Sequence, residues 1–198
     1  MKKYKKSFLF IVFGITSYFA TQAMLNNEKE REPVLKEQRD MKELEPNIGI
    51  EKEDRTRSIS ILNEVLSNTS VLLFQTLNYH WNLVGPQFND YHKLLDGQYH
   101  ELFSRLDDIA ERIRAIGGIA VASMSEMAKN ASLKEDTDNI PQPTDMIKNL
   151  LQQHESLIRM IRSGIEKTTK DVGTNNFLTD LIEKHEKTAW MLRSLIAR

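Results

Sequence analysis

The sequence predicts an all-α protein, a four-helix bundle with a short extra helix in the connection between its second and third long helices. Three observations predict it. Apolar residues recur at three- and four-residue intervals along four long segments, which is the spacing of one buried helix face. Gly-Pro and Gly-Gly pairs interrupt the pattern, and no segment alternates like a strand. Four long amphipathic helices favour a bundle.

The first helix is expected from Ser58 to about Leu83, where Gly85-Pro86 ends it. The second ends at Gly117-Gly118. Ser123 and Glu126 have the spacing of a helix cap. Gly173 is expected to separate the last two helices. The remaining expected helices are 88–116, a short one to about residue 130, one carrying the apolar residues 147–165, and one carrying the apolar residues 177–196.

Residues 1–23 have the features of a secretory signal peptide. Four lysines precede an apolar run over residues 7–20, and small residues follow at Thr21 and Ala23. The run is shorter than the roughly 20 residues that a spanning helix needs. Export to the periplasm or beyond is therefore expected, with no stable membrane span in the mature chain. An uncleaved membrane anchor is the alternative.

Residues 24–57 predict a flexible charged arm, and residues 58–198 the folded domain. The arm contains Pro33, Pro46 and Gly49 and few apolar residues. Its acids outnumber its basic residues, and the whole chain has a formal net charge of −1, so charge gives no reason to expect nucleic acid. The chain has no cysteine, which excludes disulfides and thiolate metal sites.

Two histidines and two carboxylates are the candidate metal ligands: His80, His92, Asp107 and Glu111. Imidazole and carboxylate together suit iron and similar metals. Each residue also has an ordinary structural explanation. A histidine on an apolar stripe often forms a hydrogen bond in the core, and acids four residues apart often form a solvated helix face.

Helix geometry separates these four groups within one chain. Fifteen residues between His92 and Asp107 span about 22 Å of helix, while an antiparallel hairpin brings His80 level with His92. Asp107 and Glu111 point away from the core stripe of their own helix, on a side that also carries Asp96, His100 and Phe103. An outward aromatic residue suggests an interface. A second copy packed antiparallel on this face would bring its acids to these histidines and complete two sites per dimer.

Four other residues have secondary interpretations. Trp81 beside His80 suggests an electron donor that limits the escape of radicals, although packing in the core is the simpler explanation. His100, His154 and His185 are interpreted as structural. The shared site has open coordination positions for an oxidant and room for a second, weaker metal.

The motif from Asn78 to Phe88 (Asn-Tyr-His-Trp-Asn-x-x-Gly-Pro-x-Phe), then His92, then residues 107–118, resembles the Dps family of mini-ferritins (DNA protection during starvation). Residues 185–193 resemble that family's last helix, and the likeness extends over residues 58–198. It implies a ferritin-like bundle assembled as a hollow dodecamer. It also implies ferroxidase sites between two-fold-related subunits, built from His80 and His92 of one chain and Asp107 and Glu111 of the other, with Trp81 beside them.

The resemblance further implies a function in oxidative stress, namely oxidation of Fe(II), preferably by hydrogen peroxide, and storage of the ferric mineral. Two features depart from the family pattern. The arm is net acidic where many members carry a lysine-rich DNA-binding tail. Asn175 and Asn176 stand where the family's iron-entry pore has acids, which leaves Asp180 as the pore candidate. A DNA-condensing cage and a helical surface assembly without catalysis are the alternatives.

Overall fold

The computed structural model describes residues 46–136 and 140–197. The predicted signal peptide and most of the predicted arm lie outside these residues. In the described part of the chain, no helix is long and apolar enough to cross a membrane. The helices there are α2 (Lys52–Asn82), α3 (Phe88–Ala115), α4 (Met124–Asn130), α5 (Pro143–Lys167) and α6 (Val172–Ile196).

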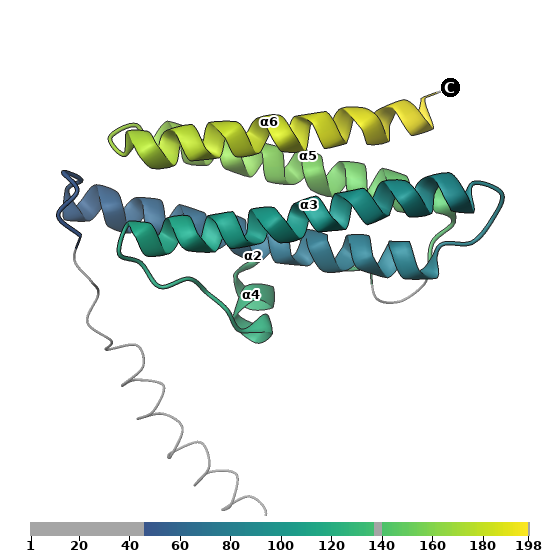
Figure 1. Cartoon of the computed structure of the whole chain (residues 1–198), viewed down its shortest axis with the longest axis horizontal. Coiled ribbons are helices and arrows are strands. Elements are labelled where there is room, and N and C mark those ends of the chain that lie inside the picture. The colour runs from purple at the N-terminus through teal and green to yellow at the C-terminus, as the bar shows by residue number, and fades with distance from the viewer. Residues whose placement is uncertain (1–45, 137–139, 198) are drawn as a thin grey trace, which may run out of the picture. The chain divides into compact units, whose positions relative to one another are not determined.

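The four long helices form two antiparallel pairs, α2 with α3 and α5 with α6, and short α4 lies outside α2 (Figure 1). Contacts at both ends of α5 show that it runs antiparallel to α2. Asn149 donates to the Tyr79 hydroxyl at one end, and Asn68 contacts the Met160 sulfur at the other. α3 and α5 are therefore parallel, which explains why the connection over residues 116–142 is long. The all-helical bundle with a short extra helix is confirmed.

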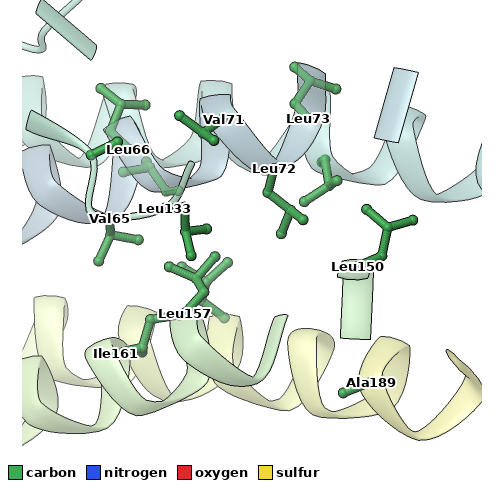
Figure 2. Close-up of a cluster of buried hydrophobic side chains, with 14 of the residues drawn as sticks. Val65, Leu66, Val71, Leu72, Leu73, Leu133, Leu150, Leu157, Ile161 and Ala189 are labelled. Atoms are coloured by element: carbon green, nitrogen blue, oxygen red, sulfur yellow. The ribbon is translucent and has the colours of Figure 1, made fainter. Parts of the chain in front are cut away.

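The core lies between the two pairs. Apolar side chains of α2, including Val65 and Leu72, face Leu150, Leu157 and Ile161 of α5 (Figure 2). Most of these side chains are wholly buried, and each contributes roughly 1.5–3 kcal/mol relative to exposure. The three- and four-residue spacing in the sequence is the direct cause, because it gives each helix one continuous apolar face.

Several predicted boundaries are confirmed. The Ser123 side chain accepts a hydrogen bond from the Glu126 amide and caps α4, as the sequence indicated. Gly85 and Gly117, both with positive φ, lie just after α2 and α3. In that left-handed region glycine avoids the steric penalty of a Cβ atom. The Gly118 amide then donates to the Ile113 carbonyl and closes the end of α3.

The start of α2 differs from the prediction. The helix begins at Lys52, so residues 52–57, predicted to belong to the flexible arm, are helical. Charge pairs stabilise this turn where apolar periodicity is missing. Arg57 lies 2.6 Å from the Asp54 carboxylate, and Lys170 lies 3.7 Å from the other oxygen of the same group. A turn of this kind leaves no apolar spacing in the sequence.

The predicted break at Gly173 is wrong. α5 ends at Lys167 and α6 begins at Val172, so Gly173 lies in the first turn of α6. Asp171 starts that helix, since its carboxylate accepts from the Thr174 amide at 3.0 Å. The glycine serves a different purpose. A Cβ at residue 173 would lie 2.8 Å from the Arg112 guanidinium, which donates to Asp171.

Buried Asn68 fastens the connection after α4 to the middle of α2. Its side-chain oxygen accepts from the amides of Ser132 and Leu133 and from the Ser132 hydroxyl, at 2.9–3.1 Å. Its side-chain nitrogen donates to the Glu64 carbonyl at 2.8 Å. One amide side chain therefore satisfies polar groups that the crossover carries into the edge of the core.

Replacing Asn68 with alanine is expected to lower the free energy of unfolding by about 3 kcal/mol, because it leaves buried amide hydrogens without an acceptor. Urea unfolding followed by circular dichroism at fixed protein concentration measures the change. Asn130→Ala, at an exposed position at the end of α4, is the matched control. A loss for Asn68→Ala within about 0.5 kcal/mol, the usual range for surface changes, would contradict this account.

Candidate metal centre

His80 and His92 meet at the turn between α2 and α3. His80 lies in the last turn of α2, and His92 lies near the start of α3. Their Nδ1 atoms make reciprocal hydrogen bonds: His80 Nδ1 lies 3.1 Å from the His92 carbonyl, and His92 Nδ1 lies 3.1 Å from the His80 carbonyl. The hairpin that Gly85-Pro86 creates therefore fixes both rings against each other's backbone.

This pairing sets the tautomer of both rings. A carbonyl oxygen only accepts, so each Nδ1 must carry the hydrogen and each Nε2 keeps its lone pair. Metal-binding histidines commonly hold their second ring nitrogen in this way, which orients the ring and fixes the tautomer. The two imidazoles stack with centroids 3.8 Å apart, and Phe88 stacks on His92 at 4.9 Å. Both lone pairs are held ready for a cation.

Asp96 is a further acid at this end, and it is not among the four ligands predicted from the sequence. One of its carboxylate oxygens lies 4.0 Å from His80 Nε2 and accepts a hydrogen bond from the Tyr99 hydroxyl at 3.0 Å. The signal was present, because Asp96 follows His92 by one helical turn. The i, i+4 spacing places His92 and Asp96 on one face of α3 and so indicates this acid as a candidate.

Asp107 and Glu111 lie far from the histidines within the chain. α3 is unbroken from Phe88 to Ala115, so Asp107 is about 22 Å along the helix from His92. Both acids are exposed. Among residues 46–136 and 140–197, no three His, Cys, Asp or Glu side chains gather closely enough to hold a metal ion. One chain therefore contributes two separated groups of candidate ligands.

Large apolar side chains are exposed around these groups. Trp81 is 68% exposed, so the explanation that it packs in the core of its own chain is wrong. Phe103, between His92 and the acids on α3, is 65% exposed, and Val84 and Phe88, in and after the turn that follows α2, are also exposed. Large exposed apolar groups of this kind are common where a protein binds a partner.

Two of the other histidines form a buried pair between α5 and α6. His154 of α5 and His185 of α6 are wholly buried, with their Nδ1 atoms 3.0 Å apart. Burial, with a smaller contribution from the nearby Arg105 guanidinium, lowers the pKa of His154 to about 3, and burial also lowers the pKa of His185.

The residues at the expected iron-entry pore lie at the start of α6. Asn175 donates to the Ile165 carbonyl at 2.7 Å and so helps to end α5, while Asp180 is exposed.

Comparison with known proteins identifies the class first. Residues 59–198 match the family model described as a ferritin-like domain. Among solved structures, DpsC from Streptomyces coelicolor is similar with a TM-score of 0.74 at 27% identity, covering 76% of this chain and 90% of that chain. Dps from Vibrio cholerae O1, described as a member of a broad superfamily of ferritin-like diiron-carboxylate proteins, gives 0.73 at 29%, covering 77% and 96%. The protein has a ferritin-like fold.

A relative whose name gives its family identifies the family within that class. DNA protection during starvation protein 2 of Bacillus anthracis is 33% identical over 70% of this chain and 95% of its own length. An uncharacterised low temperature-induced protein of Nostoc is 44% identical over 76% of this chain and 86% of its own length. The chain belongs to the Dps family, as the motifs around His80 and Asp107 predicted.

Proposed function

We propose that this protein binds Fe(II) as a substrate at sites shared between two subunits, oxidises it, and stores the product. The observation that carries the proposal is the pair of imidazoles at His80 and His92, held by reciprocal 3.1 Å contacts with both Nε2 lone pairs available. Two neutral imidazoles with carboxylates form a donor set that suits Fe(II). Asp107 and Glu111 of a second subunit would supply the carboxylates.

A two-fold dimer explains the separation of the two groups. If α3 of one subunit packs antiparallel on α3 of the other, the histidine end of each helix meets the acidic end of its partner. Each dimer would then contain two complete sites. The exposed aromatic residues Trp81 and Phe103 would be covered by the same contact, as large aromatics commonly are at interfaces.

The chain's own residues would bind and orient the substrate. Their negative carboxylates would favour Fe(III) over Fe(II), which assists oxidation. One hydrogen peroxide takes one electron from each of two Fe(II) ions and two protons from solvent, its O–O bond breaks, and two waters form. Trp81, one residue after His80, would be close enough to supply an electron when only one iron is present, which would limit hydroxyl radical formation.

Assembly and location are part of the same proposal. The Dps relatives and the ferritin-like bundle support a hollow dodecamer built from such dimers, in which ferric mineral collects. The basic and apolar N-terminal sequence supports export from the cytoplasm. In such a compartment the protein would remove Fe(II) and peroxide together.

Mixing two inactive variants tests the shared site. Asp107→Ala and His80→Ala chains, unfolded and refolded together in equal amounts, should regain activity, because every mixed dimer contains one wild-type site. Random assembly should restore about one quarter of the wild-type sites. Stopped-flow absorbance of ferric product after anaerobic Fe(II) loading and peroxide addition measures the recovery.

Each variant refolded alone is the control and should remain inactive. A mixture of Asp107→Ala with Glu111→Ala is a second control. This mixture should remain inactive. Each site takes both acids from one chain, so every site lacks either Asp107 or Glu111, whichever variant supplies them. No recovery in the His80→Ala mixture, despite mixed assemblies detected by mass spectrometry, would rule out a site shared between chains.

A further inference from the structure

His100 lies on the outward side of α3, and its ring is held in one orientation. Its Nδ1 lies 2.8 Å from the Asp96 carbonyl, so Nδ1 carries the hydrogen and Nε2 keeps the lone pair. The ring stacks on Tyr99 at 4.2 Å, and Tyr99 is itself bonded to the Asp96 carboxylate. The His100 side chain is 66% exposed, so this fixed lone pair is presented to the surroundings.

The position of His100 along α3 is midway between the two groups of candidate ligands. It lies about 12 Å along the axis from His92 and about 10.5 Å from Asp107. Its direction matches that of the acids, while His92 points about 80° away from it. At 100° per residue, His100 points within about 20° of Asp107 on one side and about 20° of Glu111 on the other. It therefore lies midway along the face that the proposed dimer would bury, on the same side of α3 as the acids.

In a two-fold dimer, residues close to the symmetry axis face their own copies in the partner. An antiparallel α3 pair that joins His92 to the acids at 107 and 111 has its axis halfway between these residues, at a level between residues 99 and 102. His100 is the histidine at that level on the buried face. His100 and the partner subunit's His100 would therefore face each other across the axis, each with Nε2 directed outward from its own helix.

We propose that these two imidazoles form a second metal site, one per dimer, for a divalent transition ion of the Zn²⁺ or Co²⁺ type. This inference rests on the dimer of the proposed function, but the two His100 rings are not among the four proposed ferroxidase ligands. Imidazole nitrogen is a preferred ligand of these ions. The Asp96 carboxylate, with one oxygen 3.7 Å from His100 Nδ1, contributes negative charge that favours a cation nearby. Water would complete the coordination.

Cobalt titration of the assembled, iron-free full chain tests the proposal. Calorimetry and visible absorption should show a class of Co²⁺ sites with one ion per two chains, in addition to the ferroxidase sites. His100→Gln should remove this class and keep wild-type Fe(II) oxidation. Asp107→Asn should do the reverse. Asp108→Asn is the control, because Asp108 is an exposed acid that points about 80° away from His100 on α3. This change should affect neither the Co²⁺ class nor Fe(II) oxidation.

The geometry has an independent test, because the chain contains no cysteine. His100→Cys chains should be joined in high yield by a short bifunctional maleimide. Lys93→Cys chains should not, since the two copies of residue 93 would lie about 20 Å apart along the axis.

Absence of the half-equivalent class in the wild type, its survival in His100→Gln, or failure of His100→Cys to cross-link would overturn the second site. These outcomes are distinct from failure of the proposed function, which would appear as Fe(II) oxidation unchanged by Asp107→Asn. A protein that oxidises Fe(II) through Asp107 and shows no half-equivalent Co²⁺ class would keep the function and lose only the second site.

Discussion

Replacing Asp107 with asparagine is expected to slow Fe(II) oxidation by peroxide at least about 100-fold, since loss of a second-shell partner alone typically costs 10–100-fold. Asp107 is exposed in its own chain, so the fold should be unaffected, with a change in unfolding free energy within about 0.5 kcal/mol. His80→Ala should cause a similar loss of rate. Stopped-flow measurement of ferric absorbance, with thermal unfolding measured in parallel, separates chemistry from stability.

The neighbouring Asp108→Asn provides the control for charge. It removes the same charge one residue away, at an exposed position that points about 100° from Asp107, and should keep the wild-type rate. If Asp107→Asn also kept the wild-type rate, the acid would not be a ligand, and the shared site would need a different carboxylate.

Acid is expected to destabilise the bundle through the buried pair His154–His185. Both pKa values are lowered in the folded protein, His154 to about 3, mainly because burial disfavours the charged ring. The unfolded chain therefore binds more protons as pH falls below about 6.5, and the free energy of unfolding decreases by about 1.4 kcal/mol per pH unit for each extra proton that the unfolded chain binds. His154 alone should remove about 3 kcal/mol between pH 6.5 and 4.

Charged groups around this pair act in the same direction. Arg105 of α3 and Lys184 of α6 both disfavour a second positive charge, although Glu101 binds Arg105 at 2.6 Å. Urea unfolding at a series of pH values measures the slope. A double variant, His154→Leu with His185→Leu, should have a shallower dependence on pH than the wild type. Leu157→Met, a core change without a titrating group, should keep the wild-type slope; equal slopes for the double variant would contradict the assignment.

The helices could be predicted from the sequence because apolar spacing alone determines which face each helix buries. The cap at Ser123 was predictable because it depends on two residues three positions apart. The first turn of α2 was not predictable in this way, since charge pairs stabilise it in place of apolar spacing, and one of them involves Lys170, more than a hundred residues away. The start of α6 was not predicted correctly because glycine commonly ends helices, whereas here Asp171 caps the helix and Gly173 lies inside it.

The candidate site was predictable in residue identity and only partly in geometry. Spacing indicated that His80 and His92 lie level with each other, but not that each Nδ1 bonds to the other's carbonyl. Asp96 gained its significance only from its 4.0 Å approach to His80. The contact between His154 and His185 was equally hidden, because two apolar stripes do not reveal which of their members meet across the bundle.

The unbroken α3 fixes both the distance and the angle between His92 and Asp107. Inserting one residue between His92 and Asp107 would turn the acids by about 100° and move them by about 1.5 Å, which would spoil both shared sites of a dimer at once. Extra residues in the long crossover between α4 and α5 would cost only a little loop entropy. Insertions and deletions in natural versions of this protein should therefore be tolerated in that crossover and absent from α3 between His92 and Asp107.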